Sequence, residues 1–252
     1  MIHDAYIRHI PESPCAVLMI HGILGSPIQF RDLLPEIPAD WSVYNILLEG
    51  HSGSVQDFSR TSMANWERQV QNLLDSIFQE HRHLLIVVHS MGCLFALDAA
   101  IRFPERIDAL MLLQPPLQLR VSPGILGRSL LVALGRTRPG TRAAAMAAAT
   151  GIAMTPKLWQ YLGWIPRYLE LFRKIADTNK RLSPLAVPTE VFLSARDELV
   201  SMRSERKLPH REQIRVTPLP TSSHYAYSAP DTVLLRQRLS RQVQNIEKSS
   251  HR

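Results

Sequence analysis

The sequence predicts a doubly wound α/β fold, in which helices cover both faces of a mostly parallel sheet and one helical insertion interrupts the order. Three observations predict this class. Apolar runs of strand length recur along the 252 residues, helical patterns separate them, and each run is continuous rather than alternating. Continuous apolar runs are typical of parallel strands buried on both faces, and strands that alternate with helices produce a doubly wound sheet.

The predicted strands are distributed from the N-terminal to the C-terminal part of the chain. They are Cys15–Ile20, Val43–Leu48, Leu84–His89, Ala109–Leu113 and Val191–Ser194, with Ile214–Leu219 as a weaker candidate. Three helices are predicted between or after them. They are a helix in which Trp66, Val70, Leu73, Leu74 and Ile77 recur at helical steps, a helix over Ser90–Arg102, and a helix over Asp231–Ile246. Thr61 or Ser62 could cap the first helix, Pro104 ends the second, and Pro230 suits the start of the third.

One segment, from Gln114 to Leu185, has no strand pattern. Glycine, proline and arginine punctuate two or three helical stretches there, including Arg142–Ala149 and Arg167–Asp177. We therefore predict a core made of residues 1–113 and 186–252, and a helical lid insertion made of residues 114–185.

The composition fits one globular domain with a substantial hydrophobic core, because 45% of the residues are hydrophobic and 20% are charged.

No basic segment followed by an apolar run begins the chain, and the apolar run at residues 143–154 is too short to span a membrane. Cys15 and Cys93 both lie in apolar stretches, which favours reduced thiols over a disulfide. These features predict a cytoplasmic protein. The sequence does not define the oligomeric state.

The formal net charge of +7 raises the hypotheses of a nucleic-acid or anionic-membrane partner. The basic residues lie singly between Arg120 and Arg181, and again after Arg236, without forming one tract. This pattern favours a solvated basic surface, so we expect no nucleic-acid partner. A surface that docks on a membrane remains an alternative.

The strongest chemical signal is the segment from Leu84 to Gly92, in which an apolar strand leads directly to Ser90 and a helix begins there. Such a sharp turn exposes a serine hydroxyl and directs the next backbone N–H, that of Met91, toward a developing oxyanion. Gly92 suits a crowded turn. The alternative is that Ser90 is an ordinary helix N-cap.

Three further segments follow predicted strands. The loop His21–Gly25 follows the first strand, and the N–H of Ile23 could be a second oxyanion donor. Asp197 and Glu198 follow the strand Val191–Ser194, and His224 lies in the loop after the last strand. Each feature alone could be an ordinary turn or surface residue. Together they lie at the carboxyl ends of successive strands, where open α/β sheets bind ligands.

These residues resemble the α/β-hydrolase superfamily, in particular the bacterial carboxylesterase and monoacylglycerol-lipase-like group. The matching features are His21-Gly22 with Gly25, the segment Leu47–His51, the turn at Ser90, the Asp197 turn and His224. The resemblance covers nearly the whole chain. It implies an α/β-hydrolase fold, and the chain order Ser, Asp, His is the order that this fold uses.

The serine turn departs from the superfamily pattern Gly-x-Ser-x-Gly-Gly at two positions. Val88 replaces the first glycine and Cys93 replaces the last. Both side chains are bulkier, so the helix must lie farther from the strand or lean differently. No reacting group is lost, and we interpret Cys93 as a packing residue.

The resemblance implies a serine esterase with a catalytic triad of Ser90, Asp197 and His224, an oxyanion hole of the Ile23 and Met91 N–H groups, and an ester substrate with a small or medium-length acyl chain. No cofactor and no metal are expected, because the reaction requires neither and no zinc-ligand spacing occurs. A dehalogenase or an epoxide hydrolase would need an aspartate in place of Ser90. The alternatives are a thioester or amide substrate, and a non-catalytic or membrane-docking protein on the same scaffold.

The lid contains several large apolar residues, among them Trp159, Tyr161 and Trp164. If these three face Ser90, they would line an apolar substrate pocket. The alternative is that they form the lid's own core.

Overall fold

The computed structural model describes residues 3–120 and 122–250. Residues 1, 2, 251 and 252 of the predicted core and residue 121 of the predicted insertion lie outside the described part. A seven-stranded sheet forms the centre of the molecule, with strand order β1-β3-β2-β4-β5-β6-β7. β1 pairs with β3 in antiparallel orientation, and every other neighbouring pair is parallel. This confirms the predicted mostly parallel, doubly wound sheet. The strands are β1 (Tyr6–Arg8), β2 (Cys15–Ile20), β3 (Ser42–Ile46), β4 (His83–His89), β5 (Ala109–Leu113), β6 (Thr189–Ser194) and β7 (Ile214–Leu219).

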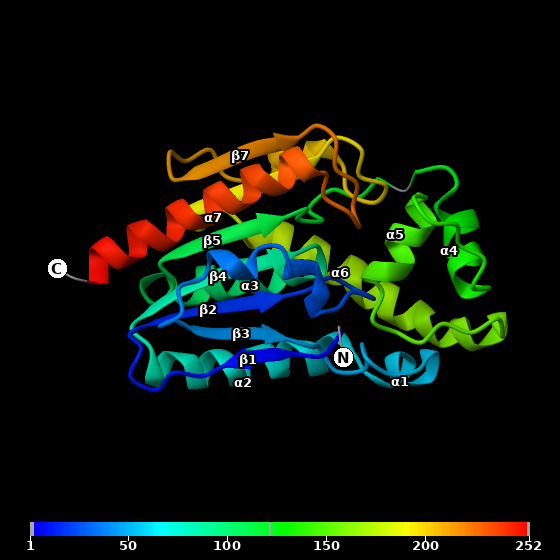
Figure 1. Ribbon diagram of the computed structural model, residues 1–252, viewed down its shortest axis with the longest axis horizontal. Helices are drawn as coiled ribbons and strands as arrows, with labels where there is room; N and C mark the ends of the chain where they lie inside the picture. Colours follow the sequence, from blue (N-terminus) through cyan, green and yellow to red (C-terminus); the bar gives the residue numbers. More distant parts are fainter. Residues whose placement is uncertain (1–2, 121, 251–252) are drawn as a thin grey trace.

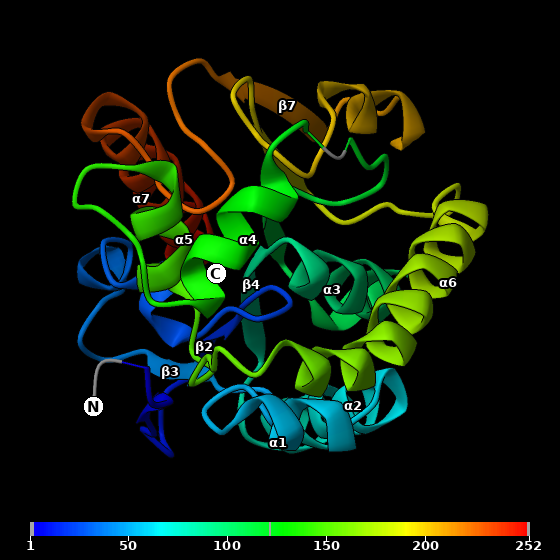
Figure 2. The same ribbon diagram turned by 90° about the vertical axis from the view of Figure 1, so that its right-hand side faces the viewer.

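The helices fall on both faces of this sheet (Figure 1). The α-helices are α1 (Val55–Arg60), α2 (Met63–Glu80), α3 (Met91–Arg102), α4 (Ile125–Ala133), α5 (Arg142–Ala149), α6 (Ile165–Arg181) and α7 (Ala229–Ser250). Short 3-10 helices are η1 (Pro27–Phe30), η2 (Leu34–Glu36), η3 (Pro104–Arg106), η4 (Leu158–Trp164) and η5 (Met202–Lys207). Figure 2 shows α2, α3 and α6 on one side of the strands and α7 on the other.

Two apolar cores form because the strands are buried on both faces. In β2, Ala16, Leu18 and Ile20 belong to the core under α2, α3 and α6, whereas the alternate residues Val17 and Met19 belong to the core under α7. Side chains of a strand point alternately to opposite faces, so a strand with two buried faces must be apolar throughout. This explains the continuous apolar runs of the sequence.

Several local features depend on capping. Ser62, rather than Thr61, caps α2, because its side chain accepts a hydrogen bond from the Asn65 N–H. Ser54 and Asp57 form a capping box at the start of α1, a helix that the hydrophobic pattern did not predict. The sequence also did not predict β1, which is a short and largely exposed edge strand.

The predicted insertion, residues 114–185, contains two kinds of helix. α6 lies against α3, and its Leu171 and Ile175 belong to the larger core. α4 and α5 lie beyond the ends of the strands, with a small core of their own around Val132, Ala143 and Met146. Within the predicted insertion, α4 and α5 are therefore the helices that lie beyond the ends of the strands, and α6 is part of the layer that covers the sheet.

Candidate active site

Ser90 occupies a sharp turn between β4 and α3. Its backbone has a φ of 51° and a ψ of −120°, a left-handed conformation that costs a non-glycine residue about 1–3 kcal/mol. The Ser90 N–H donates to the Leu113 carbonyl oxygen at 2.8 Å, which fastens the turn to β5. The side chain of Ser90 makes no capping hydrogen bond, so the interpretation as an ordinary N-cap does not hold.

Two glycines allow the chain to pass close to this turn. A Cβ atom on Gly92 would lie 2.3 Å from the Ile20 carbonyl oxygen, so only glycine lets α3 begin against the end of β2. A Cβ atom on Gly22 would lie 2.8 Å from Cβ and 3.3 Å from Oγ of Ser90. The loop that carries Ile23 therefore borders the serine side chain. Met91 is the first residue of α3, where backbone N–H groups lack partners within the helix.

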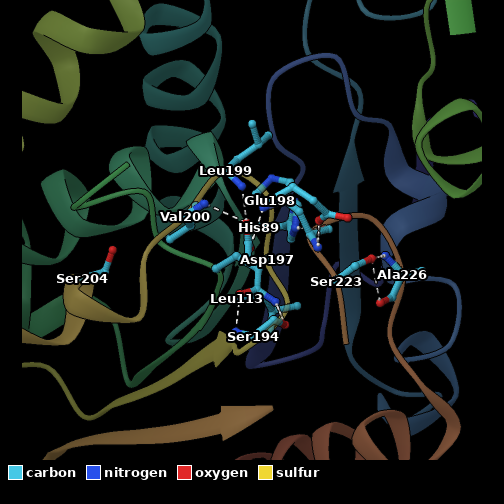
Figure 3. Close-up of polar contacts among 12 residues, drawn as sticks. His89, Leu113, Ser194, Asp197, Glu198, Leu199, Val200, Ser204, Ser223 and Ala226 are labelled. Atoms are coloured by element: carbon cyan, nitrogen blue, oxygen red, sulfur yellow. Dashed lines mark hydrogen bonds and ion pairs between the residues drawn. The ribbon is translucent and has the colours of Figure 1, made fainter. Parts of the chain in front are cut away.

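His224 and Asp197 form a buried pair. His224 Nδ1 lies 2.8 Å from Asp197 Oδ2, and both residues are almost wholly buried. The other carboxylate oxygen, Oδ1, accepts hydrogen bonds from the Leu199 and Val200 N–H groups, each at 2.7 Å (Figure 3). Burial acts to raise the pKa of Asp197, but His224 and these donors outweigh it and hold the pKa below its usual value. The carboxylate is therefore ionised and oriented toward the imidazole.

Glu198, the other acid of this turn, contacts His224 in a different way. Its Oε2 atom accepts a hydrogen bond from the backbone N–H of His224 at 3.0 Å. Its Oε1 atom forms an ion pair at 3.5 Å with Arg142, the first residue of α5. Glu198 is 1% exposed, so this buried carboxylate connects the histidine loop to the start of α5. No local sequence pattern indicates this contact.

Gln114 is a second residue that the sequence analysis missed. It follows β5 with a φ of 56° and is fully buried. Its backbone N–H donates to the Phe192 carbonyl oxygen at 2.8 Å. Its side-chain oxygen accepts from the Ser194 N–H at 2.8 Å, and its side-chain NH₂ group donates to the Ser194 hydroxyl. These contacts join the ends of β5 and β6, and the Ser90 contact with Leu113 adds β4. Ser90 and the Asp197 turn are thereby held by one set of hydrogen bonds.

His89, which precedes Ser90, supports the histidine loop. Its Nε2 atom lies 3.1 Å from the carbonyl oxygen of His224, and this nitrogen must donate because a carbonyl only accepts. Burial, with a contribution from His224, lowers the pKa of His89 to about 3. His89 is therefore neutral and binds the loop as a hydrogen-bond donor.

The Cys93 side chain is packed against carbonyl groups at the ends of β4 and β5. Its Sγ atom lies 3.4 Å from the Leu113 carbonyl oxygen and 3.6 Å from that of Val88, and burial raises the pKa of the thiol well above its usual value. A buried, protonated thiol is inert, which agrees with the interpretation of Cys93 as a packing residue.

A cavity of about 250 Å³ borders His224. Three residues of one face of α5, Ala145, Ala148 and Ala149, form one wall. The remaining lining residues are Ile28, Gln29, Arg31, Asp32, His89, His224, Tyr225, Ala226 and Tyr227. The cavity therefore lies between the lid, the loop after β2 and the histidine loop.

The three aromatic residues predicted to bind substrate occupy other positions. Trp164 is buried, donates from Nε1 to the Val55 carbonyl oxygen at 2.9 Å and packs against Phe58. Tyr161 packs on Trp164 and donates to the Thr155 carbonyl oxygen. Trp159 is 67% exposed. Trp164 thus fastens η4 to α1 and Tyr161 packs behind it, and none of the three lines the cavity beside His224.

In the described part of the chain, His9, Glu80 and His81 are grouped closely enough to hold a metal ion. Both ring nitrogens of His81 are already engaged, one with the Ser13 carbonyl oxygen and the other with the Tyr44 hydroxyl. The group lies where α2 ends, before β4 begins, far along the strand from Ser90. It contributes no ligand to the Ser90 site.

The comparisons with known proteins agree with this fold. The alpha/beta hydrolase fold family matches residues 16–232, so the chain belongs to that family. No curated protein matches the chain. A solved structure from work on the metagenome-derived lipolytic enzymes LipS and LipT has a TM-score of 0.73 and 19% identity, over 96% of this chain and 98% of that one.

Two further structures show how varied the chemistry of similar folds is. The monoacylglycerol lipase of Paleococcus ferrophilus has a TM-score of 0.66 and 16% identity, over 95% of this chain and 98% of that one. A haloalkane dehalogenase variant from Bradyrhizobium elkanii has a TM-score of 0.64 and 15% identity, over 98% of each chain. At these identities the likeness shows the fold, and the chemistry has to be argued from the site.

Proposed function

We propose that this chain is a serine hydrolase that cleaves a carboxylic ester through an acyl-enzyme. The observation that carries the proposal is the buried His224–Asp197 pair at the same sheet edge as Ser90 in its left-handed turn. With Nδ1 of His224 donating to Asp197, Nε2 is the nitrogen left to act as a base. The serine at position 90 also separates this chain from dehalogenase chemistry, which needs an aspartate there.

In the proposed reaction, Ser90 Oγ attacks the substrate carbonyl carbon while His224 Nε2 takes the hydroxyl proton. The oxyanion accepts hydrogen bonds from the Ile23 and Met91 N–H groups, each of which typically contributes about 3 kcal/mol in such sites. His224 then gives its proton to the departing alcohol, and the acyl group remains on Ser90. A water molecule repeats the same steps, which releases the acid and restores the serine.

The cavity beside His224 suits the departing alcohol. His224 lines it and Ser90 does not, and the group that receives the proton from His224 must lie next to that imidazole. Alanine side chains from α5 give the cavity an apolar wall, while Gln29, Arg31 and Asp32 give it a polar one. We therefore assign the alcohol portion of the ester to this cavity.

Labelling with a fluorophosphonate tests the proposal. We expect the probe to attach to Ser90, so that Ser90→Ala abolishes labelling while the matched variant Cys93→Ala retains it. Hydrolysis of p-nitrophenyl esters should disappear with the same substitution. Labelling that persists in Ser90→Ala would contradict the proposed nucleophile, and a comparison of matched ester and thioester substrates would reveal a preference for another acyl bond.

A further inference from the structure

All of the net positive charge of this chain lies in one segment. Between Asp108 and Glu170 the sequence contains no Asp or Glu but seven Lys or Arg residues. The rest of the chain contains 22 residues of each sign, so its formal charge is zero. The charged segment spans α4, α5 and η4, and Arg136, Arg138 and Lys157 are exposed there.

The same segment also exposes large apolar side chains. Of the thirteen such residues that are exposed in the described part of the chain, nine lie between Asp108 and Glu170. Leu126 and Leu130 are one turn apart on α4, with Leu131 beside them, and Leu126 is 82% exposed. Leu158, Trp159 and Leu162 are the exposed residues of η4. We call these six residues of α4 and η4, together with the exposed Arg136, Arg138 and Lys157, the lid-end surface.

The lid-end surface lies at one end of the molecule. In Figure 1 the arrows of the parallel strands, all except β1, point toward α4 and α5, and Figure 2 looks onto that end. The cavity beside His224 has a wall of α5 residues, so it belongs to the same end. A partner on this surface would therefore lie next to the candidate active site.

We propose that the lid-end surface docks on an anionic lipid bilayer. Exposed Leu and Trp side chains combined with basic residues are typical of proteins that bind anionic membranes. The anionic lipid headgroups attract the basic side chains, and the apolar side chains insert at the boundary between the headgroups and the acyl chains. The basic residues are separated from one another along the chain, and lipid headgroups, which move freely in the plane of a membrane, can pair with such separate charges. A second copy of this chain would bring two positive surfaces together, and their repulsion disfavours it.

This docking is peripheral. No helix in residues 3–120 and 122–250 has the length and hydropathy needed to cross a bilayer. The attraction between basic residues and headgroups is screened by salt, so binding should weaken as the ionic strength rises. The inference is independent of the chemistry at Ser90, and its tests therefore use the Ser90→Ala protein.

Co-sedimentation with vesicles tests the charge requirement. We expect the full-length protein to bind vesicles that contain phosphatidylglycerol at least about tenfold more tightly than vesicles of phosphatidylcholine alone, and high salt to remove the difference. Arg136→Glu combined with Arg138→Glu should reduce binding by about tenfold or more. Arg241→Glu is the control and should not change it, because Arg241 lies in the second half of α7, a helix that runs away from α4 and α5 toward the C-terminus (Figure 1).

Trp159 supplies a second readout, because it is the exposed tryptophan of the chain and Trp41, Trp66 and Trp164 are at most 5% exposed. Brominated lipids should quench its fluorescence, and Trp159→Phe should abolish that quenching. Leu126→Ser combined with Leu130→Ser should weaken binding, whereas Val233→Ser on α7 should not. Circular dichroism and thermal unfolding establish that each variant is folded.

Three results would overturn the proposal. The first is equal binding to neutral and anionic vesicles, and the second is binding that the Arg136 and Arg138 substitutions leave unchanged. The third is a concentration-dependent dimer, or a complex with an acidic polypeptide such as polyglutamate, that the same substitutions abolish while vesicles are not bound. The first two would show that the basic residues of this surface do not recognise anionic lipid, and the third would assign the lid-end surface to another occupant.

Discussion

Asp197 and Glu198 are neighbours in the sequence, yet they contact different parts of His224. Asp197 faces the imidazole ring, whereas Glu198 accepts from the backbone N–H and pairs with Arg142 of α5. Adjacent side chains at the end of a strand point in different directions, which separates their contacts. Substitution of Asp197 and substitution of Glu198 should therefore lower kcat by different factors.

We expect Asp197→Asn to lower kcat by about 10⁴-fold, because the amide no longer stabilises the imidazolium or fixes the tautomer. Glu198→Gln retains an oxygen that can accept from the His224 N–H but loses the attraction to Arg142, so we expect a loss of about tenfold or less. Steady-state kinetics on a p-nitrophenyl ester measure both. Glu212→Gln, on an exposed loop, is the control, and a larger loss for Glu198→Gln than for Asp197→Asn would contradict these roles.

The sequence predicted which residues lie at this edge but not how they are supported. Ser90, Asp197 and His224 each follow a strand that its apolar pattern makes recognisable, so their order along the chain places them at one edge. The Glu198–Arg142 ion pair depends on where α5 packs, and no local pattern specifies that. The same holds for Gln114, whose role depends on its backbone φ and on the neighbouring strand.

At the scale of helices and strands, the predicted strands are all present within a few residues of their expected bounds. The elements that the pattern missed are short. β1 has three residues and exists because β3 offers it an edge, and α1 has six residues and depends on its capping box. Hydrophobic periodicity needs a longer window than either of these, so it indicates neither element, and the Ser54-x-x-Asp57 capping pattern is a local signal for α1.

The junction of β2 with α3 leads to a prediction about stability. Gly92→Ala would place a Cβ atom 2.3 Å from the Ile20 carbonyl oxygen, so α3 has to move away from the sheet. We expect a loss of about 3 kcal/mol in the free energy of unfolding, together with a loss of esterase activity. Denaturant unfolding measures the change in the free energy of unfolding.

Gly127, in the exposed part of α4, is the matched control for Gly92. A Cβ atom there meets no atom within 4 Å. Gly127→Ala should therefore stabilise the protein by about 0.5–1 kcal/mol, because alanine is the better helix former. If the two substitutions had equal effects, the close approach of α3 to β2 would not be the determining factor.

The faces of α5 lead to a prediction about specificity. Ala145 lines the cavity beside His224, whereas Ala144 is outside both the cavity lining and the small lid core. Ala145→Leu should fill part of the cavity and lower kcat/KM by about tenfold for an ester of a bulky alcohol, with little change for an ethyl ester. Ala144→Leu should affect neither substrate. If Ala145→Leu lowers activity on both esters equally, the alcohol does not occupy this cavity.

At the scale of the whole molecule, three buried histidines make stability depend on pH. Burial lowers the pKa of His21 to about 4 and that of His89 to about 3, and it lowers the pKa of His51 well below 6.5. In the unfolded chain these histidines take up protons as the pH falls below 6.5, whereas the folded protein keeps them neutral. The free energy of unfolding therefore decreases from pH 6.5 downward.

Each histidine should contribute about 1.4 kcal/mol per pH unit within this window. Between about pH 7.5 and about pH 5.5 we expect the free energy of unfolding to fall by about 4 kcal/mol, as measured by urea titration. His51→Gln should remove about a third of that dependence, and His210→Gln, at an exposed position, should leave it intact. A stability that is constant across this range would show that the three histidines are not buried as neutral groups.

The pairing of β5 with β6 also fixes how the intervening segment is attached. The chain leaves the sheet after Leu113 and returns at Thr189 on the neighbouring strand, where Leu110 and Thr189 are partners. Because the two strands are parallel, the chain leaves β5 at the carboxyl edge of the sheet and must return to the opposite edge before β6 begins. α6, which packs against α3, makes this return. The pairing of β5 with β6 therefore depends on neither α4 nor α5, so substitutions in those two helices can change what the protein binds while the strands that carry Ser90 and Asp197 keep their register.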